Sequence, residues 1–262
     1  EKNKNQTTIN SILEILLNKN FSREDSLLAI GGGITGDVGG FAASLFKRGL
    51  HFINIPTTLL AQVDSSIGGK TGVNSKYGKN LIGSFYQPKL VISDIDTLKT
   101  LNRREIVCGY GEILKHSIIS KKKFFKYLDQ NFDDIIKLKS PYIEKAIFES
   151  CKIKKDVVEK DEKESNLRKK LNFGHTFGHS FEASLGYSKK LNHGEAVILG
   201  MMMAVKFSNK NKFLNIYDYK LISDHYKNSK LPSDIKKYFK SKDLDKIIKF
   251  MKTDKKNNTM PK

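Results

Sequence analysis

Apolar and polar positions follow two different patterns along this chain of 262 residues. Residues 7–18 repeat isoleucine and leucine at a helical spacing behind polar starters, which predicts an amphipathic helix. Short apolar runs at 26–30, 51–56 and 89–94 predict strands. The small residues of 36–46 predict a closely packed helix after the first run. This alternation through about residue 96 predicts an α/β layer with a parallel sheet.

The pattern changes near Thr97, beyond which the strand signals vanish and long helical segments follow. Segments 141–164 and 191–210 have the spacing of helices several turns long. The alanines, methionines and valines of the second segment predict a face buried in the core rather than a binding role. We therefore expect an α/β domain over 1–96 and an all-helical domain over 97–262.

Composition limits where the protein works and how it could bind a metal. Hydrophobic residues make up 39% of the chain, enough for a large core. No apolar run approaches the length of a membrane span, and no basic N-terminal stretch leads into the apolar segment of a secretory signal. We therefore expect a cytoplasmic protein that does not bind a membrane. The two cysteines, Cys108 and Cys151, cannot make a disulfide framework, so a metal would need histidine and carboxylate ligands.

The formal charge of +19 raises nucleic-acid binding as an alternative. Arginine, which proteins favour for reading bases and phosphates, accounts for only five of the 47 basic residues. The lysines are also concentrated after Val205, in a region poor in motifs. A solvated lysine surface accounts for this distribution, and we expect no nucleic-acid partner.

The first candidate binding motif is GGGITGD at 31–37, between a predicted strand and a predicted helix. Glycines there let backbone N–H groups approach a pyrophosphate, and the helix N-terminus favours an anion. The motif is not GxGxxG, and Asp37 lies one turn away instead of about 20 residues further on. A tight strand-to-helix connection without a ligand is the alternative interpretation.

The second motif is DSSIGGKTGVNSKYGKNLIG at 64–83, which predicts a basic loop. Its five glycines are costly to order, and a phosphate-rich ligand would offset that cost. GGKT at 68–71 is similar to the end of a P-loop, but the first glycine of the P-loop pattern is absent. A nucleoside triphosphatase is therefore disfavoured.

The third set consists of histidines and a carboxylate in the helical half: Glu112, His175, His179 and His193. Imidazole and carboxylate are ligands that zinc prefers, and His175 and His179 lie one helical turn apart. Thr176 follows His175, so the glutamate of the HExxH metallopeptidase motif is absent. Core histidines without a metal are the alternative. Together the three motifs indicate an enzyme that binds an anionic substrate between two domains.

Six long segments carry a closer resemblance: GGGITGDVGGFAAS, IPTTLLAQVDSSIGGKTGVN, GKNLIGSFYQP, GYGEILKH, LRKKLNFGHTFGHSFE and LNHGEAV. With them the chain closely resembles the 3-dehydroquinate synthase family over nearly its whole length. The resemblance implies an α/β N-terminal Rossmann-like NAD domain followed by an all-α C-terminal metal-binding domain, in a homodimer. It also implies conversion of 3-deoxy-D-arabino-heptulosonate 7-phosphate (DAHP) to 3-dehydroquinate and phosphate, the second step of the shikimate pathway.

The family's metal and catalytic positions can be carried over residue by residue. The resemblance implies Zn²⁺ or Co²⁺ bound by Glu112, His175 and His193, an open site of three ligands. His179 is then a proton-transfer residue rather than a ligand, as is Glu164. Lys70 and Lys154 complete the implied catalytic set.

The resemblance also assigns the binding residues. NAD would contact Glu1, Lys4, Gly33, Ile34, Thr35, Gly36, Asp37, Thr57, Thr58, Asp64, Lys70, Lys79, Thr97, Leu98, Lys99 and Thr100. The substrate's phosphate and carboxylate would contact Arg48, Asn80, Lys115, Lys154, Arg168, Asn172 and either Lys255 or Lys256, with Arg48 reaching across the dimer.

Two rival enzymes share parts of this pattern. Other sugar phosphate cyclases accept substrates without the carboxylate, whereas Arg168 with Asn172 favours a substrate that carries one. A metal-dependent glycerol or alcohol dehydrogenase would share the fold, but the DSSIGGKTGVN segment argues against it. Family members are longer at both ends, so we expect the protein to extend before Glu1 and beyond Lys262.

Overall fold

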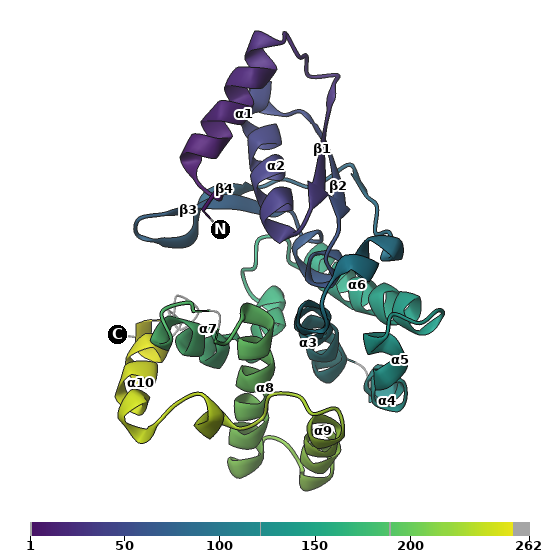
Figure 1. The fold of residues 1–262 in the computed structure, drawn as a ribbon, viewed down its shortest axis with the longest axis vertical. Helices are drawn as coiled ribbons and strands as arrows, with labels where there is room; N and C mark the ends of the chain where they lie inside the picture. The colour runs from purple at the N-terminus through teal and green to yellow at the C-terminus, as the bar shows by residue number, and fades with distance from the viewer. Residues whose placement is uncertain (1, 121, 189, 254–262) are drawn as a thin grey trace.

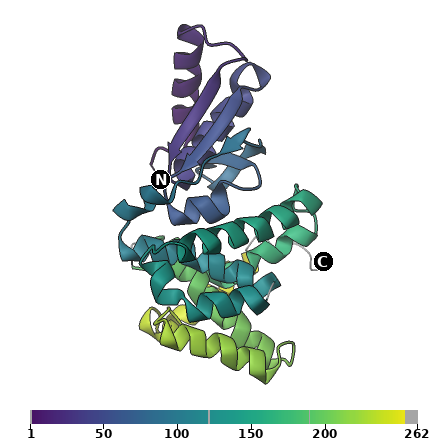
Figure 2. The same cartoon turned by 90° about the vertical axis from the view of Figure 1, so that its right-hand side faces the viewer.

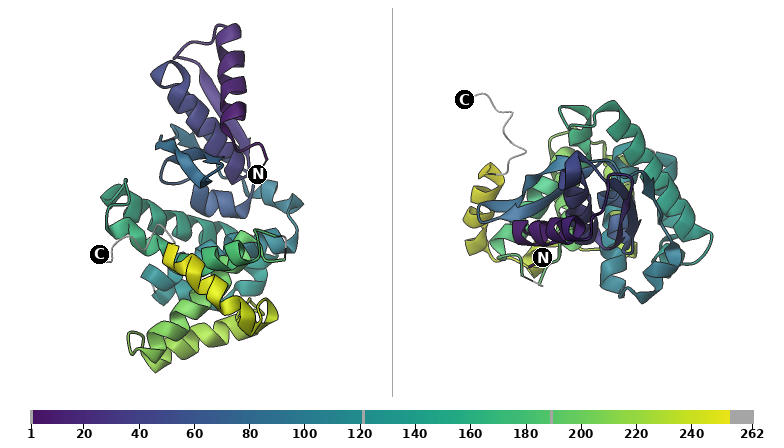
Figure 3. Two further views of the ribbon diagram at one scale, coloured as in Figure 1. Left: turned by 90° about the vertical axis from the view of Figure 1, so that its left-hand side faces the viewer. Right: turned by 90° about the horizontal axis from the view of Figure 1, so that it is seen from above.

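The computed structural model describes residues 2–120, 122–188 and 190–253. It has two parts, an α/β part at the top of Figure 1 and a helical part below it. Figure 2 and the left view of Figure 3 show the two parts stacked along the long axis, and the right view of Figure 3 looks down that axis. This arrangement confirms the predicted fold class.

The α/β part is built on a parallel sheet in the order β1-β2-β5. Helix α2 packs against the sheet and α1 packs against α2 (Figure 1). Ala29 and Phe52 of the sheet are buried with Ala43 of α2, which explains the small residues of that helix. The predicted strands and helices are confirmed, although the third strand is shorter than expected. The bounds are α1 (Gln6–Asn18), β1 (Ser26–Gly31), α2 (Gly33–Leu45), β2 (His51–Pro56) and β5 (Leu90–Val91).

The glycine-rich segment 64–83 was predicted as a loop, and this prediction was wrong for most of it. Strands β3 (Lys70–Ser75) and β4 (Gly78–Phe85) form an antiparallel hairpin. A Cβ on Gly72 would lie 2.4 Å from the Ile82 carbonyl oxygen, and one on Gly83 would lie 2.0 Å from that of Thr71. These glycines therefore serve the close approach of two strands.

Eight helices make up the helical part of the described chain. Segments 141–164 and 191–210 form α6 and α8, as predicted. The bounds are α3 (Arg103–Ser120), α4 (Lys122–Gln130), α5 (Phe132–Ile136), α6 (Tyr142–Lys160), α7 (His175–Ser184), α8 (His193–Lys210), α9 (Ile216–Asn228) and α10 (Leu244–Thr253). Short turns of helix connect the elements: η1 (Phe46–Arg48), η2 (Ala61–Ser65), η3 (Ile95–Thr100), η4 (Leu167–Asn172), η5 (Ile235–Lys237) and η6 (Ser241–Asp243).

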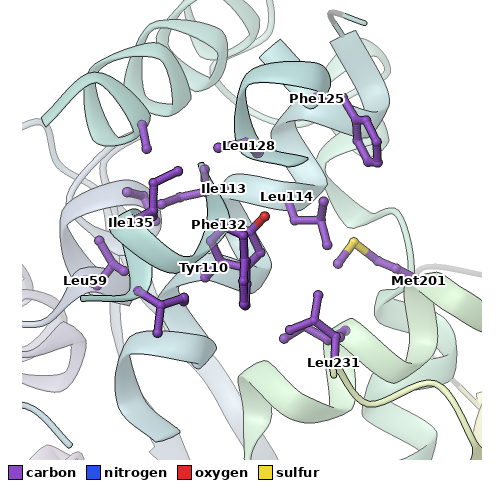
Figure 4. Packing of buried hydrophobic residues seen from close by; sticks show 14 of the residues in the cluster. Leu59, Tyr110, Ile113, Leu114, Phe125, Leu128, Phe132, Ile135, Met201 and Leu231 are labelled. Carbon is purple, nitrogen blue, oxygen red and sulfur yellow. The ribbon is translucent and has the colours of Figure 1, made fainter. Parts of the chain in front are cut away.

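The largest core lies in the helical part (Figure 4). Tyr110, Ile113 and Leu114 of α3 are fully buried there, and Phe132 of α5 packs edge-on against Tyr110. Met201 of α8 is buried in the same cluster, which confirms that the methionine stripe is core. None of the described helices is long and apolar enough to cross a membrane.

Helices α7 and α8 approach each other so closely that their contact excludes side chains. A Cβ on Gly200 of α8 would lie 2.3 Å from the carbonyl oxygen of Gly174 and 2.7 Å from the amide nitrogen of Gly178. Gly174 itself has φ of 80°, a left-handed conformation that favours glycine. The start of α7 is therefore fixed against the middle of α8.

We expect Gly200→Ala to lower the free energy of unfolding by about 1–3 kcal/mol, because the new methyl group would meet backbone atoms that cannot move aside cheaply. Urea denaturation followed by circular dichroism measures this change. Ser208→Ala, half-buried on the same helix, is the matched control and should stay within about 0.5 kcal/mol. Equal stability of the two variants would contradict the close contact.

Candidate active site where the two parts meet

Three candidate metal ligands come together from three helices. Glu112 lies in α3, whereas His175 and His193 are the first residues of α7 and α8. One potential ligand atom from each lies within 4.8 Å of the others. The start of α7 packs against the middle of α8, and Glu182 farther along α7 bonds His193, so the two helices run in opposite directions. The rings of His175 and His193 approach each other from opposite ends of the pair, with centroids 5.9 Å apart.

The hydrogen bonds of these side chains fit a metal ion. His175 Nδ1 donates to the Phe173 carbonyl oxygen at 3.4 Å, and His193 Nδ1 donates to Glu182 Oε2 at 2.9 Å. Both imidazoles therefore keep Nε2 as a lone-pair donor. Glu112 Oε1 is fully buried, lies 3.8 Å from His175 Nε2, and has no hydrogen-bond partner among the described residues. A buried carboxylate oxygen in that state is what a cation would satisfy.

Two overlapping groups also bring potential ligands together, His179 with Glu182 and His193, and Asp64 with Glu112 and His116. In the first, Glu182 is already bonded to His193, so it orients one ligand rather than replacing another. In the second, Lys154 pairs with Asp64, and its ammonium group would repel a cation there. The set of Glu112, His175 and His193 fits a metal best.

His179 faces the same cluster from the next turn of α7. Its ring centroid lies 5.3 Å from that of His175 and 5.9 Å from that of His193, over which it stacks. The one-turn spacing seen in the sequence therefore does place the two histidines of α7 side by side.

Glu182 is a residue that the sequence analysis missed. It is buried on α7, one turn after His179, and its carboxylate holds His193. Burial opposes protonation of His193, but the hydrogen bond and the charge of Glu182 outweigh it and raise the pKa of His193. The spacing H-x-x-E at 179–182 was a visible signal, since residues three apart share a helix face.

Buried lysines lie directly beside this cluster. Lys115 Nζ donates a hydrogen bond to Glu112 Oε2 within α3. Lys154 Nζ of α6 donates to both Oδ1 and the carbonyl oxygen of Asp64 in η2. Burial alone would raise the pKa of Asp64, but the charges of Lys154 and Lys115 hold it well below its usual range. The ammonium groups of Lys115 and Lys154 are thus held in a buried position, each next to a carboxylate.

The segment 161–168 brings further predicted residues into contact with the glycine-rich segment 64–83. Glu164 pairs with Lys70 of β3 and accepts a hydrogen bond from Asn172 Nδ2 at 2.6 Å. Arg168 is buried, and its guanidinium donates to the carbonyl oxygens of Gly68 at 3.1 Å and Glu162 at 2.5 Å. The structure therefore gives Arg168 a structural use in addition to the predicted contact with substrate.

The predicted cofactor residues gather around the start of α2. The segment from Gly33 through Ile34, Thr35 and Gly36 to Asp37 forms its first turn, after an N-cap at Gly32. Asp37 pairs with buried Lys4, whose Nζ also donates to Asn80 Oδ1 at 2.5 Å. Burial raises the pKa of Asp37, and Lys4 opposes this rise. Asn80, predicted for the substrate, thus lies with the cofactor residues.

The remaining predicted residues are spread around this centre. Thr57 donates its N–H to the Gly31 carbonyl oxygen, and Thr58 packs beside Gly32. Lys99 and Thr100 are exposed in η3 and Thr97 is half-buried there, whereas the Leu98 side chain is buried in the main core, so only its backbone could reach a ligand. Lys79 lies 4.3 Å from the centre of the Tyr187 ring, and Arg48 is exposed at the end of η1. Glu1, Lys255 and Lys256 lie outside the described residues.

Comparison with known proteins gives consistent matches. Models of the 3-dehydroquinate synthase N-terminal and C-terminal domains match residues 1–108 and 109–257. A 3-dehydroquinate synthase of Pelagibacter ubique (strain HTCC1062) is 66% identical over 259 residues, 99% of this chain and 70% of that protein. The boundary between the two matched domains falls within α3, and the predicted boundary at residue 96 stays a prediction.

Two solved structures share the fold. ValA, a 2-epi-5-epi-valiolone synthase from Streptomyces hygroscopicus subsp. jinggangensis 5008 with NAD+ and Zn²⁺ bound, has a TM-score of 0.84 and 26% identity, over 96% of this chain and 70% of that one. A 2-deoxy-scyllo-inosose synthase complexed with carbaglucose-6-phosphate, NAD+ and Co²⁺ has a TM-score of 0.83 and 29% identity, over 100% of this chain and 70% of that one.

We expect Glu182→Gln to weaken zinc binding roughly 10- to 100-fold, because a neutral amide holds His193 in the required tautomer less firmly than a carboxylate. Competition with a chromophoric chelator measures the affinity without any turnover. Glu159→Gln, on the exposed end of α6, is the control and should bind zinc like the parent. Unchanged affinity in Glu182→Gln would contradict this role.

Proposed function

The chain belongs to the 3-dehydroquinate synthase family, and on this premise we propose how its own residues carry the reaction. The enzyme converts DAHP to 3-dehydroquinate and phosphate, as an NAD- and metal-dependent cyclase that eliminates phosphate. The identity of 66% over 99% of the chain carries this conclusion. The group of Glu112, His175 and His193 supports it chemically, as do Lys70, Lys115 and Lys154, each of which is paired with a carboxylate.

The two cofactors have separate places in this proposal. Bound at these places, a divalent metal would supply Lewis-acid chemistry at the C5 hydroxyl of the substrate, and NAD would supply reversible hydride chemistry. Glu112, His175 and His193 would hold Zn²⁺ or Co²⁺. The first turn of α2, from Gly33 to Asp37, would hold the pyrophosphate of NAD, because its N–H groups and helix dipole favour an anion.

Proton transfer falls to His179 and Glu164. His179 lies against two of the proposed ligands without belonging to their set, so its imidazole can exchange a proton with a substrate bound there. Glu164 comes from the segment between α6 and η4, and its carboxylate is oriented by Lys70 and Asn172. Two differently placed bases suit a reaction in which protons leave and return at different atoms.

The lysines match a substrate with a phosphate and a carboxylate. Lys70, Lys115 and Lys154 come from three different elements and each is paired with a carboxylate of the protein. The anionic groups of the substrate would compete with these protein carboxylates for the ammonium groups. Little reorganisation of the lysine side chains would be needed, since they are already oriented. Lys154 and Lys70 also lie beside the proposed metal and base, so we assign them catalytic positions. Arg168 and Asn172 would favour a substrate that carries a carboxylate.

Other features of the assembly stay predictions. A homodimer in which Arg48 reaches the site of the second subunit agrees with the exposed position of Arg48. A cytoplasmic location agrees with a biosynthetic role. The contact of substrate with Lys255 or Lys256 and the contact of NAD with Glu1 also stay predictions.

The direct test is release of phosphate from DAHP by the full-length protein. We expect release to require NAD and a divalent metal, to stop on addition of a chelator, and to produce no net NADH, because the hydride returns to the substrate. Colorimetric phosphate detection and absorbance at the NADH band measure both products. Net NADH formation without phosphate would instead indicate a dehydrogenase.

The histidine pair of α7 should divide into two functions. We expect His175→Ala to abolish tight zinc binding, and His179→Gln to lower kcat about 100- to 10,000-fold while zinc binding is retained. Parallel measurement of metal content and phosphate release on both variants separates these effects. Loss of zinc from both variants alike would overturn the division.

A further inference from the structure

One short segment carries several contacts between the two parts of the molecule. Residues 161–168 connect α6 to η4 and contribute Glu164, which pairs with Lys70 of β3. Glu162 Oε1 accepts a hydrogen bond from Gln87 Nε2 at 2.7 Å. Arg168 donates to the Gly68 carbonyl oxygen at 3.1 Å. The conformation of this bridging segment therefore decides where Glu164 stands relative to the α/β part.

The Asp161 carboxylate organises the bridging segment. Its Oδ1 accepts from Ser165 N at 2.8 Å and from Ser165 Oγ at 2.9 Å. Its Oδ2 accepts from Asn166 N at 2.8 Å and from Arg168 N at 2.9 Å. These hydrogen bonds hold the pKa of Asp161 far below its usual range. The Asp161 side chain thus accepts hydrogen bonds from three backbone amides that follow Glu164 in the sequence.

Glu164 itself adopts a backbone conformation that needs such support. Its φ is 58°, in the left-handed region that residues with a Cβ rarely adopt. Its N–H donates to the Asp161 carbonyl oxygen at 3.3 Å, a long hydrogen bond. Because the residues after Glu164 are tied back to the Asp161 side chain, the chain must turn at Glu164. That turn points the Glu164 carboxylate at Lys70 and Asn172.

We propose that Asp161 is a positioning residue that presets the left-handed turn at Glu164 and so delivers the Glu164 carboxylate to the active site. The proposal rests on the function proposed above for Glu164. Asp161 does not contact the metal ligands or the lysines in any described interaction, so its effect must pass through the bridging segment.

The test uses Asp161→Asn in the full-length, zinc- and NAD-loaded enzyme. An amide can accept through only one of its two heteroatoms, so about half of the hydrogen bonds of the carboxylate are lost. We expect the kcat for phosphate release to fall at least 10-fold and the affinities for zinc and NAD to change less than twofold. Amide hydrogen exchange in the peptide covering 161–170, measured by mass spectrometry, should speed up at least fivefold. A purely structural role elsewhere would leave this peptide unchanged.

Two further variants keep the proposal falsifiable. Ser165→Ala removes a single hydrogen bond of the Asp161 carboxylate and should give a smaller change in the same direction, even if Asp161→Asn folds poorly. Glu159→Gln removes an exposed carboxylate two residues before Asp161, paired only with Lys155 in the described contacts, and should leave kcat and exchange within twofold.

A double-mutant cycle with Glu164→Gln then tests the route of the effect. If Asp161 acts through Glu164, Asp161→Asn should lower kcat by less than threefold when Glu164 is already glutamine. Full additivity of the two substitutions, or unchanged exchange in the 161–170 peptide, would overturn the proposal. Absence of phosphate release from the parent enzyme would count against the proposed function alone, because hydrogen exchange still reports on the turn.

Discussion

The close approach of α3, α7 and α8 is the constraint on which the site depends. A glycine stands next to each proposed ligand in the sequence, and each lies where a side chain would collide with a neighbouring helix. A Cβ on Gly111 would lie 2.8 Å from Ile198, one on Gly174 would lie 2.5 Å from Met201, and one on Gly194 would lie 2.4 Å from the Cα of Cys108. Three helices can therefore lie near enough for Glu112, His175 and His193 to share one ion.

The same packing explains why charged groups can be buried beside the proposed metal ligands. Lys115 and Lys154 are almost fully buried, and each has a carboxylate within hydrogen-bond reach. Burying charges is costly, and such pairs persist where function needs a dry and oriented cation. Glu112 connects the lysines to the proposed metal ligands, because one of its carboxylate oxygens faces Lys115 and the other faces His175.

The two parts of the molecule are joined chemically as well as by packing. The β3–β4 hairpin supplies Lys70 from the α/β part, and the segment 161–168 supplies Glu164 from the helical part. Figure 1 shows the hairpin at the lower edge of the α/β part, above α7. The predicted cofactor residues around α2 lie in one part and the proposed metal ligands lie in the other, so chemistry that uses both has to take place where the two parts meet.

The sequence by itself determined the class of fold and nominated most of the candidate site residues. The periodicity of 7–18, 26–30 and 51–56 predicted the right elements, because burial of one face leaves a regular record in the chain. Long motifs identified the family, since they carry residues whose chemistry cannot be exchanged. The roles of the individual site residues stay predictions that the geometry supports.

Only the tertiary structure decided how these residues are held. The hairpin at 70–85 was hidden because its glycines serve contacts between strands, which a single strand's pattern does not reveal. Glu182 and Asp161 were missed for the same reason, since an acceptor's partner is known only once helices and loops are packed. Local patterns record which face is buried, whereas the partner of a polar group depends on residues far away in the chain.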